Sequence, residues 1–391
     1  MRHLLVNRLG LAICLVCLSA GFGGGQAFAD VISCGQTITQ DTKLDTDLIC
    51  PGDGIKIGAD NVTLDLNGHS ITGSGRTGTY TGIENGGPYA GPDGNTSGRG
   101  HDNVTIENGS IRDFFICVSV GGVGQNIIRD LRAHGCGENG GVASAILLDS
   151  GTHDTVVEGN LLHDNETGIE GVGLGSDALS VAHHNIARDN TVWDNGQGIT
   201  LGGRDNRVEH NSAFNNRSGG VGACCEDGVV SHNVVTSDDP FSSSFGITGG
   251  VGTTIDHNLS TGNGIGIYGL GSTVEHNVAA NNLFLGIFGF SAMIERNVVH
   301  DNAGRGILAA REAGSLGTGL VAHNVVDHNG YGVQGGGGDG IAVSEGITVK
   351  KNRANDNYGL GIDAAAGAID GGGNHASGNG DPRQCVNVVC R

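Results

Sequence analysis

The strongest constraint on the fold is a short motif that recurs at intervals of 19 to 28 residues. Each copy has an aliphatic residue three positions before an Asn and a small apolar residue two positions after it, then a second Asn or Asp and Gly-Ile. The most regular copies read Ile255-Asp-His-Asn258, Val274-Glu-His-Asn277 and Ile294-Glu-Arg-Asn297. A period of this length leaves no room for a helix and is typical of a solenoid of short strands. The first Asn occupies positions 211, 233, 258, 277, 297, 324, 352 and 374.

The motif also predicts which side chains face inward. The aliphatic residue, the small apolar residue and the Ile of Gly-Ile are expected to share one narrow core, because alternate residues of a strand point to the same side. Asn suits the bends, since it tolerates the left-handed backbone region, and its amide can continue a ladder of hydrogen bonds between coils. We therefore predict an all-β fold, a single-stranded right-handed parallel β-helix of about thirteen coils spaced about 4.8 Å apart.

The pattern divides the chain into four parts. Residues 1–29 have basic residues, an apolar stretch and a small-x-small site, Ala27-Phe28-Ala29, and are expected to be a signal peptide. Residues 30–60 are expected to form an N-terminal cap, 61–373 the parallel β-helix and 374–391 a C-terminal cap. Caps are needed because the end coils of a solenoid would otherwise expose their core and unpaired backbone groups.

Two registers compete in the stretch from 181 to 199. Asn185 and Asn190 have the five-residue spacing of the motif, and so do Asn190 and Asn195. We favour the second pair for the coil that enters Gly198-Ile199.

Charge and hydropathy restrict the partners and the compartment. The formal net charge of −20 argues against nucleic acid or an anionic membrane surface as partner. No stretch after the signal segment is apolar for long enough to span a bilayer. The chain is expected to be secreted or periplasmic after cleavage near Ala29, and its oligomeric state stays open.

The cysteines fit an exported chain. Two of the ten, Cys14 and Cys17, fall in the signal segment, and the remaining even number suggests disulfides. For the adjacent Cys224 and Cys225, a vicinal disulfide and a metal or redox role both stay open, although the Cys-x-x-Cys metal spacing is absent. Local pairing is expected within three pairs: Cys34–Cys50, Cys117–Cys136 and Cys385–Cys390.

The N-terminal strands add a family resemblance. Together with the repeat, Cys34-Gly-Gln-Thr-Ile38, Leu48-Ile-Cys50 and the run from Ile57 to Gly68 resemble bacterial secreted right-handed β-helix repeat proteins of the pectate-lyase-like superfamily. The resemblance covers nearly all of the chain after residue 29 and implies the fold. It does not imply one reaction, because the same scaffold hosts polysaccharide lyases, glycoside hydrolases, uronan epimerases, glycan depolymerases and non-enzymatic members.

Family motifs narrow the chemistry. The Asp-Pro-His-Asp of alginate epimerases is missing, since Asp-Pro occurs only before Phe241 and Arg383. Polygalacturonases combine paired Asp with Gly-His-Gly and Arg-x-Lys, of which only Asp238-Asp239 is present. The copper-site maturation β-helix proteins of nitrous oxide reductase are relatives by fold, but a Met/His copper cluster is not evident in a chain with two Met.

In enzymes of this resemblance the substrate lies along the outer face of the Gly-Ile strands. Alternation places Asp149 and Glu170 there on consecutive coils, two residues out of register, with backbones roughly 8 Å apart. The pair is a candidate acid/base pair for glycoside cleavage, and a candidate Ca²⁺ site. The alternative is that both are solvated positions in an acidic chain. Glu84 completes the expected acidic centre.

Residues 74–102 interrupt the repeat with a long loop, which is expected to form one wall of a groove near Glu84. Arg99 or His101 is a candidate base for a lyase, although Arg99 can equally pair with a surface acid. Aromatic residues make up only 4% of the chain, which limits sugar stacking. The candidate substrate-binding residues are Tyr80, Tyr89, Arg99, His101, Tyr268 and Phe288.

Histidines precede the first Asn of several coils. Imidazoles about 5 Å apart on successive coils could share a metal ion or form a structural stack. The structural stack is favoured, because Arg296 and Lys351 occupy the same position in other coils. The histidines concerned are His210, His232, His257, His276 and His323.

The sequence thus predicts an exported carbohydrate-active β-helix protein that acts on or binds a polysaccharide, as a lyase or glycoside hydrolase, with Ca²⁺ as candidate cofactor. The alternative is a non-catalytic surface or periplasmic β-helix protein that binds glycans or proteins.

Overall fold

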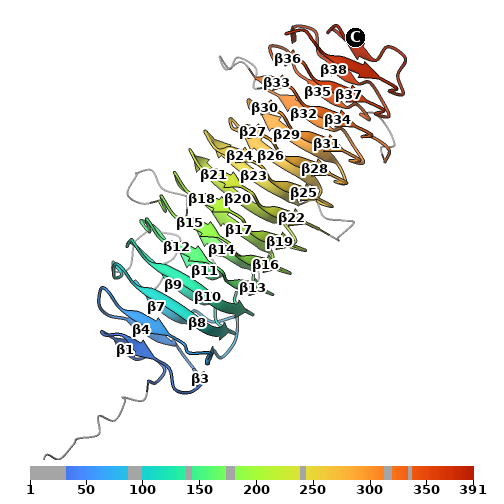
Figure 1. The fold of residues 1–391 in the computed structure, drawn as a ribbon. Coiled ribbons are helices and arrows are strands. Elements are labelled where there is room, and N and C mark those ends of the chain that lie inside the picture. The colour runs from blue at the N-terminus through green and yellow to red at the C-terminus, as the bar shows by residue number, and fades with distance from the viewer. Residues whose placement is uncertain are drawn as a thin grey trace, which may run out of the picture. The chain divides into compact units, whose positions relative to one another are not determined.

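The computed structural model describes seven stretches of the chain, in which strands and turns follow one another without a helix (Figure 1). None of the described residues forms a helix that could cross a bilayer. The signal peptide expected over residues 1–29 lies outside the described residues. The stretches are 32–86, 99–137, 143–172, 181–237, 244–311, 319–332 and 337–391.

One sheet, called here the long sheet, runs the length of the solenoid. Among the described residues it has fifteen strands that pair side by side in chain order. They are β1 (Thr37–Ile38), β4 (Ile55–Ile57), β7 (Thr81–Asn85), β9 (Ile116–Val120), β11 (Ser144–Leu148), β14 (Thr167–Gly171), β17 (Gln197–Leu201), β20 (Gly219–Glu226), β23 (Phe245–Val251), β26 (Ile265–Leu270), β29 (Leu285–Phe290), β32 (Ile307–Ala310), β35 (Ile341–Val343), β38 (Ile362–Ala364) and β41 (Cys385–Val386).

Two ladders of short parallel strands complete each coil, and β8 (Thr105–Arg112) and β10 (Ile127–His134) run through both. The second ladder contains β2 (Thr42–Lys43), β5 (Thr63–Asp65), β12 (Val156–Glu158), β15 (Ile186–Arg188), β18 (Arg207–Glu209), β21 (Val229–Ser231), β24 (Thr254–Asp256), β27 (Thr273–Glu275), β30 (Met293–Glu295), β33 (Leu320–Ala322), β36 (Thr348–Lys350) and β39 (Ile369–Asp370). The third contains β3 (Leu48–Ile49), β6 (Ser70–Thr72), β13 (Leu161–His163), β16 (Thr191–Trp193), β19 (Ser212–Phe214), β22 (Val234–Thr236), β25 (Leu259–Thr261), β28 (Val278–Ala280), β31 (Val298–His300), β34 (Val325–Asp327), β37 (Arg353–Asn355) and β40 (His375–Ser377).

This all-parallel arrangement is the right-handed parallel β-helix expected from the sequence. Crossover connections between parallel strands are almost always right-handed. The expected number of about thirteen coils is not confirmed, because strands of the long sheet also lie inside both expected caps. Within 30–60, β1 pairs with β4, and β2 and β3 pair with the next coil. At the other end β41 pairs with β38.

Disulfide bonds join the three cysteine pairs expected from the sequence. The Cα–Cα distances are 5.4 Å for Cys34–Cys50, 5.8 Å for Cys117–Cys136 and 6.2 Å for Cys385–Cys390. The vicinal disulfide considered for Cys224 and Cys225 is not formed, and their Sγ atoms lie 3.6 Å apart. Burial raises the pKa of the Cys224 thiol to about 12, with the neighbouring thiol of Cys225 acting in the same direction. A thiol with such a pKa stays protonated at neutral pH, which disfavours a metal or redox role.

Each recurring corner consists of a residue in the left-handed region followed by a buried Asn. His257 has φ 54° and Arg296 has φ 55°, whereas Asn258 follows inside the corner and is 2% exposed. The expectation that the motif Asn itself takes the left-handed conformation is therefore wrong. The left-handed residue turns its own side chain outward, so the Asn amide points inward, where it reaches the backbone of neighbouring coils.

The buried Asn side chains form the expected ladder. The Oδ1 of Asn277 accepts hydrogen bonds from the backbone N–H and from Nδ2 of Asn258, both at 2.9 Å. Asn258 Nδ2 also donates to the Val230 carbonyl at 2.8 Å. A second ladder runs along the next corner and ends on Gln384, whose Oε1 accepts from the Asn379 amide at 2.9 Å. Most buried Asn amides of the two ladders are thus paired, as burial requires, whereas Asn126 Nδ2 has no partner.

The core follows the motif with one correction. The aliphatic residue before the Asn and the small residue after it are buried, as in Val274 and Ala279. Ile265, however, lies in register with outward-facing Phe245 and Leu285, and the core position belongs to Ile267. The reason is Gly266, where a Cβ would lie 2.6 Å from the Gly286 carbonyl oxygen of the next coil. Because the backbones approach so closely there, the strand bends and alternation is interrupted.

Candidate functional site

The outer face of the long sheet carries one row of side chains in register across its strands. The row places Glu84 opposite Ser119, and Leu147 opposite Glu170. Glu84 and Glu170 are separated by three strand spacings, roughly 14 Å, so Glu84 is not close to the other two predicted acidic residues. From β7 to β38 the row is Glu84, Ser119, Leu147, Glu170, Thr200, Gly222, Thr248, Tyr268, Phe288, Leu308, Ala342 and Asp363.

Asp149 and Glu170 come together on adjacent strands. Glu170 is paired with Leu147, and Asp149 follows two residues later, just past the end of β11. Asp149 Oδ1 accepts a hydrogen bond of 2.6 Å from the Ser150 N–H, and Glu170 Oε2 accepts one of 2.7 Å from Ser144 Oγ. Strand rise and spacing put the two backbones roughly 8 Å apart.

Burial raises the pKa of both carboxyl groups above its ordinary value. Burial raises the pKa of Asp149, against the lowering effect of its hydrogen bonds from Ser150. Burial also raises the pKa of Glu170, and the negative charge of Asp149 adds to the rise, against the Ser144 hydrogen bond. Raised carboxyl pKa values on neighbouring groups are characteristic of acid/base sites, although structural networks can produce them too.

The surroundings of this pair are enclosed. The outward residues Ser119 and Leu147 are 5% and 0% exposed, and β7, β9 and β11 are buried at every position. Farther along the same face, β26 and β29 alternate between buried and partly exposed residues. The acidic pair itself is half-buried beside these buried strands, so its charges interact more strongly than in open water.

Glu84 has a charged partner of its own. Lys56 Nζ lies 3.3 Å from Glu84 Oε2 and also 3.3 Å from an Asp53 oxygen. Burial raises the pKa of Glu84 despite the attraction of Lys56. The arrangement is that of a half-buried ion cluster near the N-terminal end of the long sheet.

The loop candidates lie at the edge of the face. Arg99 Nη2 pairs with Asp102 at 2.7 Å, and His101 Nδ1 lies 3.2 Å from Asp60 Oδ1. The His101 backbone is held by the buried Asn85 side chain. Arg99 lies beside Gly122, and the neighbouring Gly121 lies beside Asp149. Arg99 and Asp149 therefore lie near the same strand end. Tyr80 is 40% exposed next to β7, and Tyr89 lies outside the described residues.

Three aromatic rings lie on consecutive strands of the same face. The ring centroids of Tyr268 and Phe288 are 5.4 Å apart, and Phe245 extends the group with a centroid 5.3 Å from Tyr268. Phe245 was missed from the sequence. Strict alternation would place Phe245 on the core side with Ile247, and the interruption of alternation at Gly246 turns it outward.

A polar cavity of about 450 Å³ was also missed. It opens at the corner before β14 and β17, where the Arg76 guanidinium reaches the Asp164 carbonyl and Arg217 Nη2 lies 3.8 Å from Glu166. Beside this corner His163, Trp193 and Phe214 stack, with centroid distances of 4.4 and 5.6 Å. Its lining residues are Arg76, Gly137, Asp164, Asn165, Glu166, Asp194, Asn215 and Arg217.

Four of the five motif histidines stack as favoured from the sequence, and Arg296 separates His323 from them. Centroid distances are 4.9 Å for His210–His232, 5.1 Å for His232–His257 and 4.9 Å for His257–His276. Within the described residues one group of possible metal ligands occurs, formed by Asp256, His257 and His276.

Comparisons with known proteins give similarities at low sequence identity. Residues 139–287 match a family model described as "Periplasmic copper-binding protein (NosD)". No curated protein sequence matches the chain.

Three solved structures illustrate the similarity. The A-module of mannuronan C-5 epimerase AlgE4 from Azotobacter vinelandii is 15% identical over 86% of this chain and 91% of that chain, with a TM-score of 0.49. A tailspike protein mutant of E. coli bacteriophage HK620 in complex with pentasaccharide is 12% identical, over 91% and 73%, with a TM-score of 0.49. The Dettilon tailspike protein is 15% identical, over 88% and 61%, with a TM-score of 0.41.

Proposed function

We propose that this right-handed parallel β-helix protein binds a polysaccharide along the outer face of the long sheet and cleaves it at the Asp149–Glu170 pair. The observation that carries the proposal is the pair itself: two carboxyl groups with raised pKa on adjacent strands of one face. The protein would do this outside the cytoplasm, in keeping with its disulfide bonds.

The two carboxyl groups suit different roles. Glu170 is raised in pKa by burial and by the charge of Asp149, so it keeps a proton to higher pH and can protonate a glycosidic oxygen. Asp149, when ionised, can accept a proton from water or, in a lyase, from the sugar. Backbones roughly 8 Å apart permit the carboxyl separation of roughly 6.5–9.5 Å at which an inverting glycosidase accommodates a water molecule.

The aromatic group would hold the chain of sugars farther along the face. Phe245, Tyr268 and Phe288 lie on three successive strands, and their rings offer flat apolar surface beside hydrogen-bonding groups. For an acidic glycan the other role of the pair is to bind Ca²⁺ with both carboxylates ionised, in place of acid catalysis by Glu170, because an ion would offset repulsion between the substrate and an acidic protein.

Activity on a panel of neutral and uronate glycans, with and without Ca²⁺, tests the proposal. We expect new reducing ends or unsaturated uronates from the wild type and at least about a 100-fold loss in Asp149→Asn and Glu170→Gln. Asp363→Asn is the control, since Asp363 lies in the same row near the other end of the long sheet. Equal activity in all variants, or none in the wild type, contradicts cleavage.

The second candidate is a non-catalytic periplasmic binding protein. The match of residues 139–287 to a family model with a periplasmic binding description favours it. Glycan binding without product formation, with binding lost in Tyr268→Ala, would support this alternative for the same face.

A further inference from the structure

A second constellation lies away from the long sheet, at the corner between the second and third ladders. There β24 ends at Asp256 and β27 ends at Glu275, and each is followed by a left-handed histidine. The two histidines, His257 and His276, have the same φ of 54° on adjacent coils, so their rings project to the same side.

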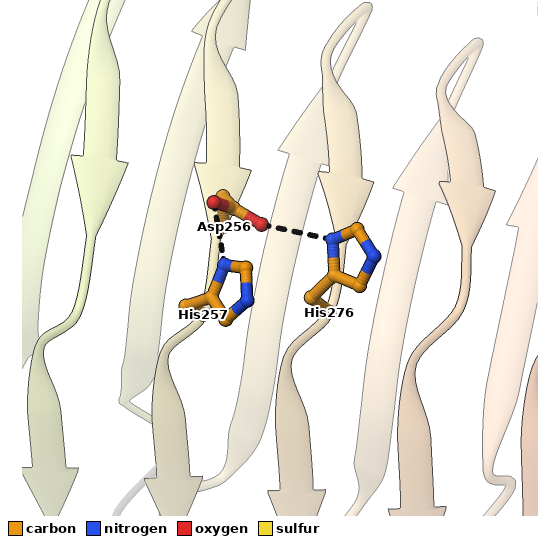
Figure 2. A group of neighbouring side chains, drawn as sticks. All are labelled: Asp256, His257 and His276. Atoms are coloured by element: carbon orange, nitrogen blue, oxygen red, sulfur yellow. Dashed lines mark hydrogen bonds and ion pairs between the residues drawn. The ribbon is translucent and has the colours of Figure 1, made fainter.

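Figure 2 shows the carboxylate of Asp256 at one edge of the two rings, with a dashed line to a nitrogen of each. Its Oδ2 lies 2.6 Å from His257 Nδ1 and its Oδ1 lies 3.1 Å from His276 Nδ1. The rings are stacked with centroids 4.9 Å apart and planes inclined by 16°. Both Nδ1 atoms therefore face one carboxylate, and the three ligand atoms lie within 4.8 Å of one another.

We propose that Asp256, His257 and His276 bind one divalent transition-metal ion through a carboxylate oxygen and the two Nδ1 atoms. Two imidazole nitrogens and one carboxylate oxygen are ligands that zinc and copper favour, whereas Ca²⁺ and Mg²⁺ prefer sites made of oxygen alone. Ligands about 2.1 Å from a tetrahedral ion lie roughly 3.4 Å apart. To reach this geometry the oxygen–nitrogen distances of 2.6 and 3.1 Å would lengthen, and the two Nδ1 atoms, now within 4.8 Å of each other, would take the same spacing.

The proposed metal site is open to solvent and has a further possible ligand beside it. The side chains of His257 and His276 are 51% and 39% exposed, so water can fill the remaining coordination positions. Glu275 offers a further oxygen, since its Oε2 lies 3.7 Å from His276 Nδ1. Arg296 occupies the same corner one coil later, 3.8 Å from Glu275, and its charge ends the row of possible ligands.

The other motif histidines lack this arrangement: Glu209, which precedes His210, is paired with the Arg207 guanidinium. Ser231 stands in register with Asp256 on the previous coil, so His232 follows a residue without a carboxylate. Ala322 precedes His323 in the same way. The stack alone therefore does not select a metal site, and the Asp256 carboxylate at the edge of two rings does.

Titration calorimetry of the folded chain with Zn²⁺ or Cu²⁺ alone tests this proposal. We expect one ion per chain, unaffected by excess Ca²⁺, and binding at least about 100-fold weaker in Asp256→Ser and His276→Arg. Both variants use residues that the chain itself places at these positions, Ser231 and Arg296, so folding should persist. Electron paramagnetic resonance of the Cu²⁺ form should show coupling to two imidazole nitrogens, reduced to one in His276→Arg.

His323→Asn is the matched control, because His323 has the same left-handed corner but follows Ala322 and has Arg296, not a histidine, at the same corner one coil earlier. It should bind the metal like the wild type. Undiminished binding in Asp256→Ser, an equal loss in His323→Asn, competition by Ca²⁺ or no binding below millimolar Zn²⁺ would each overturn the proposal. The outcome is independent of glycan cleavage, since no residue is shared with the long sheet.

Discussion

At the scale of single residues, each corner is formed by two neighbouring residues with different roles. The first residue accepts the left-handed conformation and points outward, and its identity varies among His, Arg, Lys and Asp. The second is Asn, whose amide both donates to and accepts from neighbouring coils. The outer residue varies between coils because its side chain lies in solvent. The inner residue is Asn because the buried backbone groups around it need both a donor and an acceptor.

Replacing Asn277 by Ala should lower the free energy of unfolding by about 3 kcal/mol. Its Oδ1 accepts two hydrogen bonds from Asn258 and its Nδ2 donates to the Ile255 carbonyl, all in a buried corner. Denaturant unfolding measures the change. Asn281→Gly is the control, because Asn281 is a left-handed corner residue and Gly262 occupies the equivalent place on the previous coil. A change below about 0.5 kcal/mol in Asn277→Ala would contradict the role of the ladder.

The raised pKa of Glu170 predicts that the free energy of unfolding depends on pH. Because burial raises its pKa above the ordinary 4.5, the folded chain holds this proton to higher pH than the unfolded chain does. The stabilisation is complete below pH 4.5 and is lost as the pH rises through the folded-state pKa. Glu170→Gln should therefore become more stable relative to the wild type as pH rises from 4 to 8. Unfolding at several pH values measures this, with the exposed Glu345→Gln as control; parallel curves for wild type and Glu170→Gln would refute it.

At the scale of strands, the long sheet combines two different surfaces on one face. The strands β7, β9 and β11 are buried on both sides, whereas β23, β26 and β29 present aromatic rings. Tyr268 and Phe288 are in register, whereas Phe245 lies three residues before Thr248, the register partner of Tyr268, so a ligand across the strands would meet the Tyr268 and Phe288 rings with centroids 5.4 Å apart.

Tyr268→Ala and Phe288→Ala should each weaken binding of a recognised polysaccharide about tenfold, because each removes a flat apolar surface from the row. Isothermal titration or affinity electrophoresis gives the comparison. Tyr331→Ala is the control, since Tyr331 is 65% exposed and lies in a turn rather than in a strand of the long sheet. If the control loses affinity as much as the two row variants, the rings do not form the platform.

At the scale of the whole molecule, stability is distributed along the solenoid. Each coil contacts chiefly its two neighbours through three ladders, so unfolding depends on the sum of interfaces and on how the ends are held. The Cys34–Cys50 and Cys385–Cys390 disulfides lie near the two ends of the described solenoid, and Cys117–Cys136 lies within it.

Removing Cys117–Cys136 by a double Ala replacement should cost roughly 3 kcal/mol, and removing Cys385–Cys390 roughly 2 kcal/mol, because the sequence separations of 19 and 5 residues close loops of different length. Thermal unfolding of both variants under non-reducing conditions measures the order. A larger loss from the C-terminal pair would mean that holding the end coil matters more than chain entropy.

The sequence by itself determined the solenoid, because the period, the aliphatic positions and the paired cysteines are local properties of the chain. It also predicted the histidine stack and the five-residue spacing between corner asparagines at Asn185, Asn190 and Asn195. In the structure both of these spacings occur, because the three residues lie at three successive corners. The backbone N–H groups of Asn185, Asn190 and Asn195 donate hydrogen bonds to the side chains of Asn206, Asn211 and Asn216, respectively.

Only the tertiary structure decided which functional groups meet. Coils of unequal length stack in a register that sequence spacing does not reveal, so Glu84 separates from Asp149 and Glu170, while Phe245 joins Tyr268. The cavity beside Glu166 and the contact of the Asp256 carboxylate with two imidazoles likewise arise from side chains on different coils. Repetition along the chain specifies a solenoid, but its sites are made across coils, where contacts depend on register and on the reach of each side chain.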